Sequence, residues 1–198
     1  MLLLQKYLRK YKMEIKRPSD SLVIMNELVL PNDTNTLNNL MGGRLLHWMD
    51  ICAAMSAQKH ARAICVTAAV NNVAFNHPIK LGNVVTLQSK CVRAFNTSME
   101  VQIEVWTQDL TKNGDKIKCN EAFYTFVALD HDGNTVKVPP IEPLSDDEKK
   151  VFEYALLRRQ LKLMVSGKTT IDKTPELKRL FERWVSGEET PMVSIAGK

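Results

Sequence analysis

The alternation of hydrophobic and polar positions changes character several times along this chain of 198 residues. Residues 1–18 have the spacing of a short amphipathic helix, which we expect to end before Pro18 because proline disfavours helical geometry in the residue preceding it. A hydrophobic run at residues 22–30 is typical of a first β-strand that stops at Pro31. The segment 31–40 is rich in Asn, Asp and Thr, which predicts a loop.

The next segment, residues 44–63, is hydrophobic on nearly all sides of a helix, which is the pattern of a helix buried in a core. Residues 64–129 then contain four strand-like stretches without a helix between them. Turn signals separate these stretches at Pro78, Gly82, Asn96 and the hairpin candidate Asn113-Gly114. Such close spacing predicts an antiparallel sheet, and the long helix before it predicts a sheet wrapped around that helix, an α+β fold.

The C-terminal part predicts further helices. Ser145 and the acidic residues after it, up to Glu148, have the pattern of a helix-capping start, and residues 168–187 have room for one more short helix. We therefore expect three parts: an N-terminal helical extension at 1–18, a central domain at 19–144 and a C-terminal helical extension at 145–198.

The composition narrows the class of protein. A hydrophobic content of 44% in 198 residues is enough for one core. Lys and Arg number 27 against 22 Asp and Glu, a net charge of +5, which suits nucleic acid, anionic lipid or a phosphorylated small ligand equally well. Much of the positive charge lies near the two ends, where a solvated helical surface explains it as well.

The cysteines and the N-terminus indicate a cellular setting. Basic residues from Lys6 onward interrupt the apolar start of the chain, so secretion and membrane insertion are disfavoured. The four cysteines lie in apolar stretches without C-x-x-C spacing, which predicts buried thiols rather than disulfides or a zinc site: Cys52, Cys65, Cys91 and Cys119. A reducing cytoplasm is the setting that fits them.

Asp50 is the most informative residue, a carboxylate in the middle of the predicted hydrophobic helix. A buried charge is costly unless it is paired or useful, so Asp50 is a candidate for catalysis. The alternative is an exposed acid on a narrow polar stripe shared with His47, about one turn earlier.

Gly42 and Gly43 stand at the start of that helix, where free N–H groups and the positive end of the helix dipole could form an oxyanion hole. A tight turn into the helix explains the glycine pair equally well. One helix cannot bring both Gly42 and Asp50 to one carbonyl, because a rise of about 1.5 Å per residue separates them by roughly 12 Å. A homodimer with antiparallel central helices would supply two such sites by symmetry.

Asn35 lies in the preceding loop, where its amide could hold a water molecule or orient an acyl carbonyl. Asn32, Asn38 and Asn39 are equal candidates by chemistry, and a capping or turn role is open for each of them. The motifs G-x-S-x-G, G-x-G-x-x-G, the P-loop and H-E-x-x-H are missing. We expect no metal site: the isolated histidines His60 and His77 fit structural or solvent-facing roles, and His131 fits a strand-end turn.

Five ordered motifs between about residues 28 and 159 resemble the cytosolic acyl-CoA hydrolases of the hotdog superfamily, which include small bacterial acyl-CoA thioesterases and the brain-type acyl-CoA hydrolase of animals. The motifs are PNDTN, MGGRLLHWMDICAAMSA, FNHPIKLGNVV, NTSMEVQIEV and AFYTFVALDHDGNTVKVPPIEP. The chain has asparagine at Asn71-Asn72 and Asn83, where relatives often have aspartate. The resemblance implies a five- or six-stranded antiparallel sheet around the long helix, a dimer, and commonly a hexamer built as a trimer of dimers.

The resemblance also implies hydrolysis of acyl-CoA thioesters to fatty acid and coenzyme A in the cytoplasm, without a cofactor. Asp50 would be the catalytic carboxylate, as general base or as nucleophile, and Asn35 would act beside it from the partner chain. The N–H groups of Gly42 and Gly43 would stabilise the oxyanion.

Basic residues near the matching motifs are assigned to the phosphorylated nucleotide of coenzyme A: Lys80, Arg93, Arg158 and Arg159. Thr97 and Ser98 are candidates for hydrogen bonds to the pantetheine arm, although strand-edge roles fit them too. The expected partners are the acyl-CoA substrate and further copies of the chain, not nucleic acid or membrane. Two alternatives stay open: hydration or dehydration of an acyl-CoA, disfavoured because no histidine lies near Asn35, and a non-catalytic module that binds acyl-CoA or nucleic acid.

Overall fold

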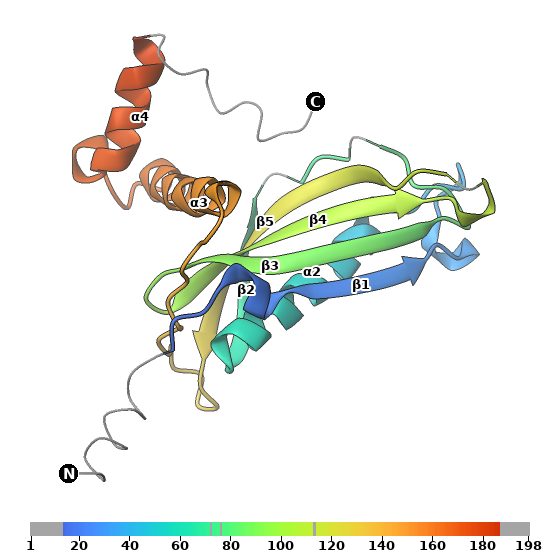
Figure 1. The fold of residues 1–198 in the computed structure, drawn as a ribbon, viewed down its shortest axis with the longest axis horizontal. Helices are drawn as coiled ribbons and strands as arrows, with labels where there is room; N and C mark the ends of the chain where they lie inside the picture. Colours follow the sequence, from blue (N-terminus) through green and yellow to red (C-terminus); the bar gives the residue numbers. More distant parts are fainter. Residues whose placement is uncertain (1–13, 72, 76, 113, 187–198) are drawn as a thin grey trace. The chain divides into compact units, whose positions relative to one another are not determined.

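The computed structural model describes residues 14–71, 73–75, 77–112 and 114–186. The chain divides into two compact units between Glu142 and Pro143. The first unit is a five-stranded antiparallel sheet with the strand order β1-β3-β4-β5-β2 (Figure 1). The strands are β1 (Val23–Leu28), β2 (Ile64–Asn71), β3 (Val84–Ala94), β4 (Ser98–Gln108) and β5 (Ile117–Leu129).

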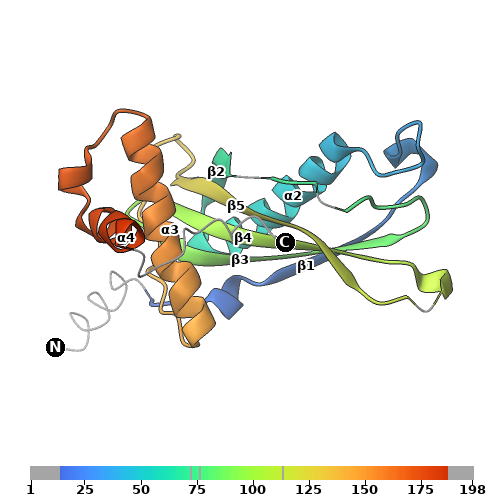
Figure 2. The same ribbon diagram turned by 90° about the horizontal axis from the view of Figure 1, so that it is seen from above.

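A long helix connects β1 to β2, which is at the far edge of the sheet. Helix α2 (Gly42–Ala61) has 20 residues and extends about 30 Å, and the strand that follows it lies at the edge of the sheet opposite β1. Figure 2 shows α2 running along one face of the sheet. The antiparallel sheet around a central helix confirms the predicted hotdog fold.

One face of α2 forms the core with the sheet. Its buried residues recur at intervals of three and four: Leu45, Trp48, Met49, Cys52, Ala53, Ser56, Ala57 and His60. The Ser89 hydroxyl of β3 donates to the Cys52 carbonyl at 2.8 Å and joins helix to sheet. The expectation of burial on all sides is wrong for a single chain, because the sheet covers only one face and leaves Ile51 and Met55 exposed at 39% and 40%.

The N-terminal segment differs from its prediction. Residues 1–13 of the expected helix lie outside the described residues, and residues 14–17 are not helical. The backbone of Lys16 donates to Pro140 and accepts from Glu142, both at 2.9 Å, which holds this segment as an extended strip. The Lys16 ammonium group donates to the His60 carbonyl at 2.6 Å and so stabilises the C-terminal end of α2. This tertiary contact outweighs the helical periodicity of the segment.

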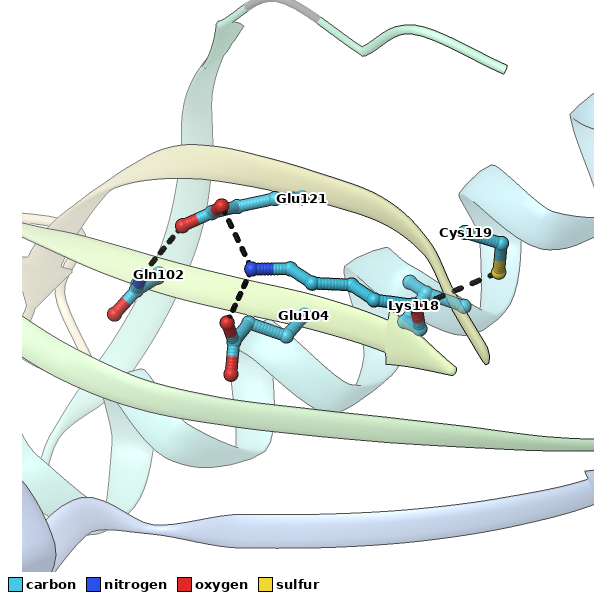
Figure 3. Close-up of polar contacts among 6 residues, drawn as sticks. Gln102, Glu104, Lys118, Cys119 and Glu121 are labelled. Carbon is cyan, nitrogen blue, oxygen red and sulfur yellow. Dashed lines mark hydrogen bonds and ion pairs between the residues drawn. The ribbon is translucent and has the colours of Figure 1, made fainter. Parts of the chain in front are cut away.

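Residues of β4 and β5 that alternate with the core residues point away from the core, and some of them form a charge network (Figure 3). Glu104 of β4 and Glu121 of β5 lie directly opposite each other, a pairing of like charges that would destabilise the sheet on its own. The Lys118 ammonium group lies between them, 2.5 Å from Glu104 Oε1 and 2.9 Å from Glu121 Oε2. Burial lowers the pKa of Lys118, but the two carboxylates outweigh it and raise this pKa above its ordinary value.

The second unit contains α3 (Asp146–Val165) and α4 (Pro175–Val185). Helix α3 begins with the predicted capping box, in which Ser145 Oγ accepts from the Glu148 N–H at 3.1 Å and Glu148 bonds back to the Ser145 N–H. None of the helices in the described residues combines the length and the hydrophobicity that a membrane span requires.

Candidate active site

Asp50 lies half-buried in the middle of α2 and accepts a hydrogen bond from Thr67 Oγ1 of β2 at 2.8 Å. The pairing of β2 with β5 shifts register between Thr67 and Ala69, an irregularity of the kind that re-aims a side chain. Tyr124 of β5 also lies near: burial and then the charge of Asp50 raise the pKa of its hydroxyl to about 12. The carboxylate is therefore held in a defined orientation from the sheet side.

Thr67 is a candidate site residue that the sequence did not single out. A threonine in a β-strand is common and carries no signal of its own. Its importance follows from the pairing of β2 with β5, which places the hydroxyl opposite the middle of α2. Thr67 is itself exposed in the single chain, so the pair that it forms with Asp50 is open to a ligand.

Gly42 and Gly43 are the first two residues of α2, so their N–H groups have no acceptor within the helix. Neither is among the positive-φ glycines, which removes the tight turn as the reason for glycine here. A Cβ on Gly42 would lie 3.2 Å from Cζ of Phe75, whereas a Cβ on Gly43 would meet no atom within 4 Å. The helix start therefore presents free donors next to open space.

The structure distinguishes Asn35 from the neighbouring asparagines. Asn35 Oδ1 accepts from the N–H groups of Leu37 and Asn39 at 2.9 and 3.2 Å, which fixes the orientation of its amide. Its Nδ2 has no acceptor among the described residues and is free to donate. Asn38 instead has a φ of 55°, a turn conformation, and Asn39 is half-buried.

The loop that carries Asn35 is attached to α2 by a partly buried ion pair. Asp33, in the short 3₁₀ helix η2 (Pro31–Asp33), is buried and lies 2.6 Å from Arg44 Nε in the first turn of α2. Its carboxylate also accepts from the Leu30 N–H at 3.1 Å, and its carbonyl accepts from Met41 at 2.9 Å. Asp33 therefore fixes the geometry between the loop and the start of the helix.

Replacing Asp33 by Asn is expected to reduce the acid sensitivity of the fold. The hydrogen bond from Arg44 holds the pKa of Asp33 below its ordinary value, which is about 3.9. The unfolded chain therefore binds this proton at a higher pH than the folded one, so the stabilisation is complete above about pH 4 and is lost as the pH falls through the folded pKa. Urea unfolding at about pH 5 and about pH 3 should show a smaller fall in stability for the variant. An equal fall in both proteins would contradict this role.

The face of the molecule around Asp50 is apolar and exposed. Strand β2 is an edge strand, and α2 beside it turns its uncovered side outward. The exposed hydrophobic residues of these two elements, each between 39% and 44% exposed, are Ile51, Met55, Ile64, Val66 and Val70. An apolar patch next to an unpaired strand edge marks an interaction surface.

The sequence of this chain is similar to those of known proteins. The profile of the thioesterase superfamily matches residues 37–113. The acyl-CoA thioester hydrolase YkhA of Bacillus subtilis is 36% identical over 139 residues, which are 70% of this chain and 80% of YkhA. The chain belongs to the acyl-CoA thioesterase family.

Other members of the acyl-CoA thioesterase family show the same likeness. Acyl-coenzyme A thioesterase 11 of Mus musculus is 41% identical over 72% of this chain, and the matched part is 24% of the mouse protein. The chain thus matches about a quarter of the length of this relative. An acyl-CoA hydrolase of Staphylococcus aureus, solved with butyryl coenzyme A and coenzyme A, superposes with a TM-score of 0.71 at 34% identity, covering 78% of this chain and 96% of that one. A hexameric acyl-CoA thioesterase gives a TM-score of 0.74 at 33% identity, covering 78% and 98%.

Within the first unit, the residues predicted to bind coenzyme A lie at two separate places. Lys80 lies in the loop before β3, bridged to Asn39 near the start of α2. Arg93, Thr97 and Ser98 surround the turn from β3 to β4, at the other end of a strand about 30 Å long. Arg158 and Arg159 are on α3, in the second unit.

The other histidines and the cysteines considered as candidates are either buried in the core or exposed on the surface. His60 is buried and lies 2.8 Å from the Pro139 carbonyl through Nε2, and burial lowers the pKa of its ring. His77 and His131 are exposed. The four cysteines are free and buried, as predicted. Among the described residues, no three His, Cys, Asp or Glu side chains are grouped so that they could hold a metal ion.

Proposed function

We propose that this protein hydrolyses acyl-CoA thioesters, with Asp50 as the catalytic carboxylate. The observation that carries the proposal is the Asp50 carboxylate, held by Thr67 on an open apolar face at the middle of α2. The acyl-CoA hydrolase of S. aureus has also been solved as variants in which an asparagine, an aspartate or a threonine is replaced by alanine. Those three positions have the same spacing along their chain as Asn35, Asp50 and Thr67 have here.

The chemistry needs few groups. Asp50 either removes a proton from the attacking water or attacks the thioester carbon itself to form an anhydride that water then cleaves. The free N–H groups of Gly42 and Gly43 stabilise the negative charge that develops on the carbonyl oxygen. Coenzyme A leaves as a thiolate, which is stable enough to leave without a strong general acid. The free Nδ2 of Asn35 donates to the carbonyl oxygen or to the water.

These groups meet only if two copies of the chain share each site. Within one chain, the rise of α2 separates Gly42 from Asp50 by about 12 Å. A second copy related by twofold symmetry, with its α2 antiparallel to the first, brings its own helix start and Asn35 to Asp50. The exposed residues of α2 and β2 supply the apolar contact for this dimer, and pairs of this kind would build a trimer of dimers.

The same symmetry resolves the separation of the predicted coenzyme A ligands. The end of one subunit that carries Lys80 then lies beside the end of the other that carries Arg93 and Thr97. Basic residues from both subunits can bind the phosphates of one nucleotide. Arg158 and Arg159 belong to the same proposal as additional cationic ligands.

The test of the function is the release of free thiol from a series of acyl-CoA substrates of increasing chain length. Because all four cysteines are buried, a thiol reagent reads the released coenzyme A rather than the folded protein. Release from at least one substrate supports hydrolysis, and the best chain length reports the depth of the acyl tunnel. Acyl-pantetheine as a parallel substrate isolates the contribution of the nucleotide, and no release from any substrate would overturn the proposal.

Replacing Thr67 by Val is expected to lower kcat about tenfold with little change in KM, because the lost hydrogen bond orients a charged carboxylate. Thr67→Ser keeps the hydroxyl and should retain most of the activity. Thr86→Val is the matched control, since Thr86 of β3 donates a hydrogen bond of the same length, 2.8 Å, to Asn26 far from Asp50 along the sheet order. If Ser is no better than Val at position 67, the hydroxyl does not position Asp50.

A further inference from the structure

Phe75 is a large apolar residue with an unusual position. It follows β2, is 54% exposed, and places its ring against Gly42 at the start of α2. The fit is close: a Cβ on Gly42 would lie 3.2 Å from Phe75 Cζ and 3.5 Å from both Cε atoms. One face of the ring is therefore covered by the helix start, while more than half of the residue remains open.

Strand β5 anchors the backbone next to this aromatic residue. Asn120 of β5 is buried and donates through Nδ2 to the carbonyl of Ala74, the residue before Phe75, at 2.6 Å. A buried amide bonded to a loop carbonyl fixes the backbone at that point. The backbone that carries Phe75 is therefore fixed to β5 while the ring contacts the start of α2.

We propose that Phe75 determines which acyl groups the site accepts, by forming the wall beside the carbon next to the thioester carbonyl. The inference rests on the proposed function, which places the carbonyl oxygen at the N–H groups of Gly42 and Gly43. A ring in contact with Gly42 then lies next to that carbonyl. It excludes water from the oxyanion and leaves room for a linear chain but not for a branch at the first carbon.

The contact also explains why residue 42 is a glycine. Gly42 is the first residue of α2 and does not have a positive φ, so its backbone conformation does not require glycine. The methyl group of an alanine would instead press on the ring, which would have to move away by a few tenths of an ångström. The glycine therefore keeps the aromatic wall close to the free N–H groups.

The test compares the best linear acyl-CoA with its α-methyl-branched counterpart. In Phe75→Ala, the ratio of kcat/KM for the branched substrate to that for the linear one is expected to rise about tenfold, the scale on which a pocket discriminates a methyl group. Leu110→Ala is the control, because Leu110 is 63% exposed on the connection between β4 and β5. The ratio of kcat/KM for the branched substrate to that for the linear one should be the same in Leu110→Ala as in the native chain.

A ratio unchanged in Phe75→Ala while the native chain hydrolyses the linear substrate would overturn this inference alone. No hydrolysis by the native chain would overturn the proposed function and this inference with it. Because the ratio compares two substrates on one variant, a general loss of folded protein does not move it.

A double variant tests the contact itself. Gly42→Ala is expected to lower kcat/KM strongly in the native background and less in the Phe75→Ala background, because the methyl group no longer meets a ring. Thermal unfolding of each variant separates this effect from a loss of folding. An equal fold loss in both backgrounds would contradict the contact as the reason for the glycine.

Discussion

Replacing Asp50 by Asn should lower the turnover of acyl-CoA about a thousandfold, the scale of an essential base or nucleophile. The amide has nearly the shape of the carboxylate, and its Oδ1 can still accept from Thr67, so the fold and the dimer should persist. Thiol release at saturating substrate measures the loss, and circular dichroism with thermal unfolding measures the fold. A folded variant with native turnover would exclude Asp50 as the catalytic group.

Asp115→Asn is the matched control, since Asp115 is an exposed carboxylate on the connection between β4 and β5. It changes the charge by the same amount and should keep native activity. If neither the native chain nor the variants release thiol but both bind acyl-CoA, the chain is a binding module and Asp50 has another role.

Mixing two impaired chains, one with Asp50→Asn and one with Asn35→Ala, is expected to restore activity. In a mixed dimer with shared sites, one site receives both substitutions and the other receives native Asp50 and native Asn35. Random pairing makes half of the dimers mixed, with one intact site of two, so the recovered activity approaches about a quarter of the native value. The measurement is thiol release after the subunits have been allowed to exchange.

The control for mixing uses Asp50→Asn with Thr67→Val. These residues contact each other within one chain, so no site in a mixed dimer contains both native Asp50 and native Thr67. The activity of this mixture should stay at the average of the activities of the two variants measured separately. If the first mixture also stays at that average, Asn35 and Asp50 do not come from different subunits, and the shared site is wrong.

The sequence predicted most helices and strands of the fold but not the long-range contacts between them. The period-two stretches became β1 to β5, and the capping pattern at Ser145 became the start of α3. The helix expected at the N-terminus does not include residues 14–17, because Lys16 bonds to a segment more than a hundred residues away. Local periodicity contains no information on such a contact.

The candidate site shows the same division. Asp50, Gly42 and Gly43 are visible in the sequence because a charge lies within a hydrophobic helix and two glycines stand at its start. Thr67 and Phe75 are not, since both depend on how β2 and the loop after it lie against α2. Composition alone could not rank the asparagines, and only the family resemblance selected Asn35; in the structure they differ in hydrogen bonding and backbone angle.

If the chain acts on acyl-CoA as proposed, the burial of its cysteines protects it from being acylated itself. A thiolate near an acyl-CoA would accept the acyl group by thioester exchange, and a released coenzyme A could form a mixed disulfide with it. Burial raises the pKa of Cys65, close in sequence to Thr67, to about 11, and that of Cys119 to about 11. Both thiols therefore form the nucleophilic thiolate less readily than an exposed cysteine does, which disfavours their acylation.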